Sequence, residues 1–185
     1  MSVLLETSVG DLVVDLFTDR CPITTKNFIK LCQMKYYNNA LFIEIQKDFI
    51  AKVENPILPA TSIYEKMGGP DKKYFADEIE LERKYNKRGL LGCSNENPNC
   101  NDSDFFITLG DDHLEQLDGK HTLFGHVAEG IELLDTINEL YSDENGRPYA
   151  NVRIKHTLVL DDPFEDEEGL ELNVDSPEMK PYVFI

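Results

Sequence analysis

Short runs of β-type residues recur along most of the chain, without a regular alternation of strands and helices. The first two runs, at 3–6 and 11–17, flank a turn in which Gly10 supplies a left-handed conformation, so they predict a hairpin. Further strands are predicted at 40–46, 49–53, 88–94, 105–109, 121–127 and 151–160. This order favours an antiparallel sheet or barrel over a parallel α/β fold.

Two stretches show the spacing of amphipathic helices. The first begins at Pro22, where a first helical turn tolerates proline, and continues through the segment 24–37. The second is 130–141, in which the leucines and Ile137 recur at helical spacing. Between the predicted strands, the segment 56–70 contains several prolines and is predicted to be a long loop, which makes it a candidate functional region.

The size and composition of the chain fit one domain followed by a tail. The 185 residues include 41% hydrophobic residues, enough for a single core. We place the domain at 1–162 and an acidic tail at 163–185. There is no secretory leader pattern and no apolar run of about 18 residues or more, so we expect a soluble intracellular protein without a membrane span. The four cysteines are expected to be free thiols.

The chain is strongly acidic. Its 18 Lys and Arg against 35 Asp and Glu give a formal net charge of −17. Nucleic-acid affinity comes largely from basic side chains that displace counterions, so direct binding of nucleic acid is not expected. Part of the excess negative charge lies at 161–172. This segment is interpreted either as a solvated tail or as a docking surface for a basic partner. We expect no regular structure from about residue 163 onward, with Phe164, Leu170 and Leu172 available to contact the domain.

The segment 41–46 raises the central question about function. Leu41, Ile43 and Ile45 alternate with Phe42, Glu44 and Gln46, which is typical of a strand with one apolar and one mixed face. Glu44 is therefore predicted to point away from the core. The second face is either open to solvent or the floor of a binding groove.

Five ordered blocks resemble the cyclophilins, the peptidyl-prolyl cis-trans isomerases. They are GDLVVDLF, NFIKLC, YYNNALFIEI followed by Phe49, SNENPNCNDSDFFIT and LDGKHTLFGHV, within residues 3–160. The resemblance implies a closed eight-stranded antiparallel barrel capped by two α-helices. The blocks VLLETSVGDLVVDLF, KYYNN and KHTLVLDDPFED resemble more narrowly the nuclear branch that carries an RNA-recognition motif after the isomerase domain. This branch implies nuclear location, with the cytoplasm as the alternative, and a place in a ribonucleoprotein or spliceosomal assembly.

The resemblance also implies where a proline peptide binds. The proline pocket falls on Phe49, Ile50, Phe106 and Leu117, with His121 at its rim. Ser94 and Asn95 match the segment whose backbone pairs with the peptide. Asp104 stands at a position where the family usually has glutamine. Gln116 replaces the tryptophan that contacts cyclosporin in the best-known members, so weak or no cyclosporin binding is expected.

The catalytic position differs from the family. Rotation about the prolyl bond has a barrier of about 18–20 kcal/mol, and a donor to the prolyl nitrogen lowers it without any cofactor. The family supplies that donor from an arginine, and Glu44 occupies its position, while Lys52 replaces the glutamine that supports it. Because an ionised carboxylate donates no hydrogen bond, we predict weak or absent catalysis, with an ion pair between Glu44 and Lys52.

The sequence raises three hypotheses about function. The favoured one is a binding module for proline-containing segments, with little catalysis. The second is an active isomerase in which Lys52, or another group, is the donor. The third is a metal site from Cys93, Cys100, His113 and His121, which we reject because these residues lack close ligand spacing.

Overall fold

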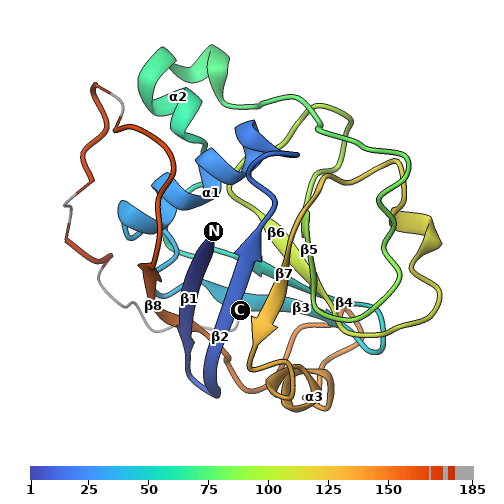
Figure 1. Ribbon diagram of the computed structural model, residues 1–185. Helices are drawn as coiled ribbons and strands as arrows, with labels where there is room; N and C mark the ends of the chain where they lie inside the picture. Colours follow the sequence, from blue (N-terminus) through green and yellow to red (C-terminus); the bar gives the residue numbers. More distant parts are fainter. Residues whose placement is uncertain (167, 173–174, 178–185) are drawn as a thin grey trace.

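The computed structural model describes residues 1–166, 168–172 and 175–177, and its main element is one eight-stranded sheet (Figure 1). Every neighbouring pair of strands is antiparallel, in the order β3-β4-β6-β5-β7-β2-β1-β8. The strands are β1 (Ser2–Thr7), β2 (Gly10–Leu16), β3 (Leu41–Gln46), β4 (Ile50–Glu54), β5 (Leu90–Cys93), β6 (Phe105–Thr108), β7 (Leu123–Glu129) and β8 (Ile154–Val159). The predicted mainly β, antiparallel fold with a first hairpin is confirmed.

The sheet curls so that its two outer strands approach each other. They are joined at an isolated bridge between Leu41 and Arg153, just before β8. Beside it, the Phe42 N–H donates to the Val152 carbonyl at 3.0 Å. The predicted barrel is therefore present, but a short seam closes it in place of a full β3-β8 ladder.

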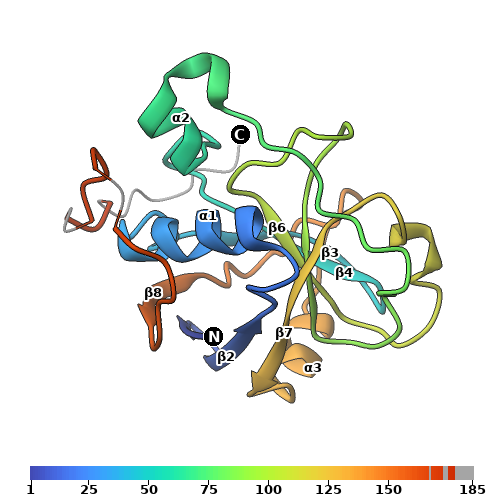
Figure 2. The same cartoon turned by 45° about the horizontal axis from the view of Figure 1, so that its top comes forward.

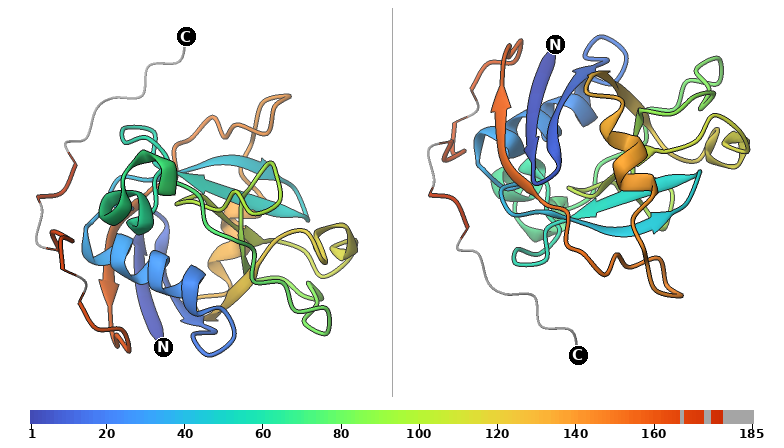
Figure 3. Two further views of the ribbon diagram at one scale, coloured as in Figure 1. Left: turned by 90° about the horizontal axis from the view of Figure 1, so that it is seen from above. Right: turned by 90° about the horizontal axis from the view of Figure 1, so that it is seen from below.

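In the described residues, three α-helices accompany the sheet. The two predicted helices are α1 (Pro22–Gln33) and α3 (Leu133–Asn138), and α3 is shorter than the predicted 130–141. Figure 3 shows α1 and α3 at opposite ends of the barrel. None of the helices in the described part of the chain has the length and apolar character needed to cross a membrane.

The third helix corrects the prediction of a long loop at 56–70. Helix α2 (Ile63–Gly68) lies between Pro59 and Pro70, and the Glu65 N–H donates to the Ser62 hydroxyl at 3.2 Å. Ser62 and Glu65 stand three residues apart, as in a capping box, and this local signal outweighs the nearby prolines. Short 3-10 helices follow at η1 (Pro70–Lys72) and η2 (Glu115–Leu117).

The core lies between α1 and the concave face of the sheet. Phe28 of α1 packs against Phe105 with ring centroids 5.3 Å apart, and against Tyr37 at 5.2 Å. A second, smaller group of buried side chains comes from β5, β6, β7 and nearby loops. It contains Tyr85, Leu90, Phe106, Leu114, Leu117 and Leu123. This second group positions the candidate site.

The segment 160–166, which we call the C-terminal strap, contacts the C-terminal half of α1 (Figure 2). Lys30 is completely buried, and its Nζ lies 2.8 Å from carboxylate oxygens of both Asp162 and Asp166. The same ammonium donates to the Phe164 carbonyl at 3.2 Å. Lys30 therefore contacts residues on both sides of the predicted domain boundary at 162. The boundary itself stays a prediction.

The described part of the tail has no helix or strand, as expected. Phe164 and Leu170 pack against the main core, as predicted for both, and Leu172 is half-buried. Residues 167, 173–174 and 178–185 of the predicted tail lie outside the described residues.

Candidate functional site

The β3-β4 hairpin turns Glu44 away from the core. The ladder shifts register between Phe42 and Glu44, as at a β-bulge, so the simple alternation predicted for 41–46 is broken. Phe42, predicted on the same face as Glu44, is buried in the core together with Ile45. Glu44 has Lys52 of β4 as its cross-strand partner. Its predicted outward direction is confirmed, although the bulge changes its neighbours.

Glu44 lines a groove of about 480 Å³. The groove lies between β4 and the segment 94–104, with Tyr74 also in its wall. Its lining consists of Glu44, Ile50, Lys52, Glu54, Tyr74, Ser94, Asn95, Glu96, Asn97, Cys100, Asp102 and Asp104. Of the two interpretations of the second face of β3, the structure favours a groove over open solvent.

The predicted ion pair between Glu44 and Lys52 is wrong. The Lys52 ammonium lies 2.5 Å from a carboxylate oxygen of Glu54, and Glu44 accepts a hydrogen bond from Gln46 at 2.7 Å. Lys52 and Glu54 are two residues apart on one strand, so their side chains share a face. Burial would lower the pKa of Lys52, but the hydrogen bond and charge of Glu54 outweigh it and raise that pKa.

The predicted proline-pocket residues come together beside the groove. Phe106 and Leu117 are buried, and half-buried Phe49 and Ile50 pack against the same group. The His121 ring meets the Phe106 ring edge-on, with centroids 5.5 Å apart, and burial lowers the pKa of His121. We call this set of five residues the apolar recess; its role in binding proline stays a prediction.

Gly92 permits the close packing behind the recess. A Cβ at this position would collide with the Phe106 ring and with the Tyr85 hydroxyl. Only glycine lets both rings lie directly over β5. The floor of the recess is therefore fixed by the backbone of β5.

The segment 94–101 is held by a residue that the sequence did not single out. Asp77 accepts hydrogen bonds from the side chains of Asn95 (3.0 Å) and Asn101 (2.7 Å) and from the Asn99 N–H (2.9 Å). Asp77 stands 18 or more residues before its partners, so no local pattern identified it. The Asn95 amide is thereby committed to supporting the groove wall.

Ser94 only partly fits its predicted role. Its N–H donates to the Asp104 carbonyl at 2.9 Å, so this donor is already engaged within the protein. Gln116 lies exposed on η2, and its amide donates to the His113 carbonyl at 3.3 Å. Gln116 is thus near the end of the recess marked by Leu117, as expected from sequence order.

Replacing Asp77 with alanine is expected to lower the free energy of unfolding by about 2 kcal/mol, because three hydrogen bonds of about 1 kcal/mol each are lost and partly recovered by water. Urea unfolding measures the loss, and amide exchange at residues 95–101 should accelerate. Asp71→Ala, an exposed acid on η1, is the matched control, with an expected change below about 0.5 kcal/mol. Unchanged exchange in Asp77→Ala would contradict the supporting role.

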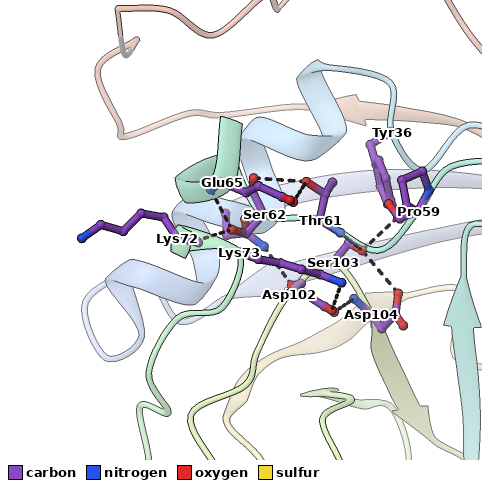
Figure 4. A network of polar contacts seen from close by, with 11 residues as sticks. Tyr36, Pro59, Thr61, Ser62, Glu65, Lys72, Lys73, Asp102, Ser103 and Asp104 are labelled. Carbon is purple, nitrogen blue, oxygen red and sulfur yellow. Dashed lines mark hydrogen bonds and ion pairs between the residues drawn. The ribbon is translucent and has the colours of Figure 1, made fainter. Parts of the chain in front are cut away.

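Asp102 and Asp104 project from a rigid turn (Figure 4). The Ser103 hydroxyl accepts from the Thr61 N–H at 3.2 Å and lies 2.9 Å from the Tyr36 hydroxyl. The Asp104 N–H in turn donates to a carboxylate oxygen of Asp102 at 3.1 Å. These contacts fix the backbone of the turn that carries the two carboxyl groups.

Burial raises the pKa of both carboxyl groups. Burial, with the nearby charges of Asp102 and Glu54, raises the pKa of Asp104 to about 7, although Lys52 and Ser103 oppose the rise. Burial is also the main cause of the raised pKa of Asp102. Near neutral pH, Asp104 is therefore divided between its neutral and ionised forms.

The chain resembles known proteins over nearly its full length. It is 50% identical over 173 residues to peptidyl-prolyl cis-trans isomerase CYP59 of Arabidopsis thaliana, covering 92% of this chain and 34% of the relative. It is 40% identical over 181 residues to human peptidyl-prolyl cis-trans isomerase-like 4, covering 96% of this chain and 37% of the relative. The chain thus spans between a third and two-fifths of the length of these relatives.

A solved structure shows the same fold. The crystal structure of a Cryptosporidium parvum cyclophilin type peptidyl-prolyl cis-trans isomerase, determined in the presence of the dipeptide Ala-Pro, matches with a TM-score of 0.78 and 34% identity. The match covers 88% of this chain and 100% of that one. The family model described as cyclophilin type peptidyl-prolyl cis-trans isomerase/CLD matches residues 2–159. The chain therefore belongs to the cyclophilin-type peptidyl-prolyl cis-trans isomerase family.

Proposed function

We propose that this cyclophilin domain binds proline-containing peptide segments and catalyses their isomerisation only weakly. The observation that carries the proposal is the placement of Glu44 in the groove, at the position that the family resemblance assigns to an arginine donor. The neighbouring apolar recess supplies a surface for a proline ring. Binding and catalysis therefore depend on different residues, and the position of the catalytic donor is substituted.

The chemistry of Glu44 supports weak catalysis. As the prolyl bond twists, the nitrogen lone pair is released and needs a hydrogen-bond donor, which an ionised carboxylate cannot be. The negative charge of Glu44 also repels the carbonyl oxygen of the bound peptide. The nearest cation, Lys52, is held by Glu54 at 2.5 Å.

An active isomerase with Lys52 as donor is the second candidate. Lys52 lies in the groove with a quarter of its side chain exposed, and its raised pKa keeps it charged. Such a role requires the ammonium to leave Glu54 when peptide binds. Lys52→Met separates the candidates, because it removes the donor and abolishes catalysis only in the second.

NMR exchange spectroscopy on one proline peptide tests both parts of the proposal. We expect peptide binding with cis-trans exchange only slightly faster than without protein. Phe49→Ala should weaken binding about tenfold, since it removes part of the recess. Tyr141→Ala removes an aromatic ring that is 87% exposed and lies outside the recess, so it is the control and should bind as wild type. Failure of the wild-type domain to bind any proline peptide would contradict the proposal.

The longer relatives frame the biological setting. Because the chain matches only part of their length, the activity of a whole protein of this kind is also a proposal. We propose a nuclear ribonucleoprotein assembly as the setting, on the sequence resemblance described above. Fractionation of cells that express the full-length protein, followed by RNase treatment of the assemblies, tests it; a purely cytoplasmic, RNase-insensitive distribution would contradict it.

A further inference from the structure

The lining of the groove is unusually acidic for a peptide-binding surface. It contains five carboxyl groups, from Glu44, Glu54, Glu96, Asp102 and Asp104, and one ammonium group, from Lys52. Lys52 forms its ion pair with Glu54, so these two charges largely cancel. The other four acids leave the groove strongly negative. A bound segment must therefore bring positive charge or avoid this wall.

The remaining acids have only weak cationic partners among the described residues. Glu44 accepts a hydrogen bond from the neutral amide of Gln46, and the closest basic atom to Asp102 is the Lys73 ammonium at 4.0 Å. Like charges held close together in a half-buried site destabilise each other. A cation from a ligand would relieve that repulsion.

The turn that carries Asp102 and Asp104 is held in place by hydrogen bonds to Ser103. Figure 4 shows both residues on the turn that Tyr36 and Thr61 hold through Ser103. From inside the barrel, the Tyr37 hydroxyl donates to the Ser103 carbonyl at 2.8 Å. The two acids are thus presented by a preorganised support and lose little conformational entropy on binding a cation.

The negative groove and the apolar recess are continuous. Ile50 lines the groove and also packs against the recess residues, so one extended peptide can reach both. An extended chain advances about 3.3 Å per residue, so three residues of a bound peptide cover about 10 Å along the groove. Within the described chain, the acids are not arranged to hold a metal ion, which leaves a cationic side chain as the fitting occupant.

We propose that the groove selects proline segments that carry an arginine or lysine side chain within a few residues of the proline. This inference rests on the proposed function, since it assumes that the segment binds through the recess. Glu96, Asp102, Asp104 and Glu44 determine the specificity by charge, and arginine fits best because its planar guanidinium can donate hydrogen bonds to two carboxylates at once.

Three series of otherwise identical proline peptides test the inference. The series carry arginine, glutamine or glutamate, placed in turn at each of the three positions on either side of proline. Binding is measured by NMR titration at pH 8 and low salt. At one or more positions we expect the arginine peptide to bind about tenfold more tightly than the glutamate peptide, with glutamine between them. The double variant Glu96→Gln with Asp102→Asn should reduce this ratio to about threefold or less.

The matched control is Glu129→Gln with Glu132→Gln, which makes the same change in net charge at exposed positions outside the groove lining. It should retain the full preference for arginine. An equal loss in the control would overturn the inference, because the preference would then come from the overall charge of the chain. An arginine peptide without proline that binds as tightly as the proline peptide would overturn it as well.

The preference for arginine over glutamate peptides should also decrease as the pH is lowered. A cation binds the ionised form of Asp104, which is lost as the pH falls through about 7. The groups facing Asp104 are Asp102, Glu54 and Lys52, with the Tyr36 hydroxyl beyond Ser103. Between pH 8 and pH 6 the arginine preference should therefore decrease, and Asp104→Asn should flatten this dependence. A pH dependence that persists unchanged in Asp104→Asn would contradict the assignment to this carboxyl group.

The outcomes separate the inference from the proposed function. If none of the proline peptides binds, the proposed function itself fails. If it binds through the recess but arginine and glutamate peptides bind equally, only the inference is overturned.

Discussion

The double variant Glu44→Arg with Lys52→Gln should isomerise a proline peptide about 100 to 1000 times faster than the wild-type domain. This is the usual effect of one preorganised donor that acts in the transition state. The arginine places a permanent donor in the groove beside the recess, where the released lone pair of the prolyl nitrogen needs it. Rates from NMR exchange or a protease-coupled assay on one peptide measure the gain.

The single variants show which change matters. Glu44→Arg alone should gain less, because the new guanidinium faces the Lys52 ammonium across the ladder. The difference in rate between the single and the double variant should be limited, because Glu54 already neutralises the charge of Lys52 at 2.5 Å. Glu44→Gln is the control that removes the charge without adding a strong donor, and it should gain only a few-fold. If the wild-type domain catalyses isomerisation rapidly and Glu44→Arg does not change the rate, the proposal of weak catalysis is contradicted.

Asp162→Ala should lower the free energy of unfolding by about 3 kcal/mol, which is the low end of the range for removing one partner of a buried ion pair. Its carboxylate is 18% exposed and accepts from both Lys30 at 2.8 Å and Gln33 at 2.7 Å. Without it, the completely buried Lys30 keeps only a weak ionic partner, because Asp166 is 72% exposed. Urea unfolding at pH 7 measures the change.

Two neighbouring acids provide the controls for Asp162→Ala. Asp166→Ala should cost less than about 1 kcal/mol, as expected for an exposed carboxylate. Asp161→Ala, at an exposed position, should change stability by less than about 0.5 kcal/mol. Equal losses in all three variants would mean that general tail charge, and not the Lys30 contact, holds the strap.

The effect of Asp162 should also depend on pH. Burial alone would raise the pKa of Asp162, but hydrogen bonds from Lys30, the Phe164 N–H and Gln33 lower it below its ordinary value. A depressed carboxyl pKa stabilises the folded state above the unfolded value of about 4, and this contribution disappears as pH falls through the folded value. Wild type and Asp162→Ala should therefore converge in stability at low pH.

The sequence predicted the strands well because alternation and turn residues are local signals. It also placed Glu44 outside the core, although the bulge at Ile43 was invisible in the pattern and moved Phe42 inward. The ion pair of Lys52 was wrongly assigned across the ladder, because resemblance gives no information about which of two nearby carboxylates is closer. The sequence prediction lacks helix α2, because the prolines of the segment 56–70 indicate a loop more strongly than Ser62 and Glu65 indicate a helix start.

Long-range contacts marked the limit of prediction. Lys30 was not singled out by any sequence pattern, and it is buried against a residue 132 positions later. Asp77 lies outside every recognisable block and still supports the groove wall through Asn95 and Asn101. Such partners depend on how the finished barrel brings distant segments together.

The pairing of the first strand with the last has a consequence for synthesis. Strand β1 bonds to β8 along Val3–Thr7, so its outer edge stays unpaired until Ile154–Val159 have been made. At about 5–20 residues per second, a ribosome needs roughly 10 to 30 s to travel from β2 to β8. During that interval a nascent chain carries an open, apolar strand edge, which is a template for association with other chains. Crowded polysomes are therefore where this domain should depend most on chaperones.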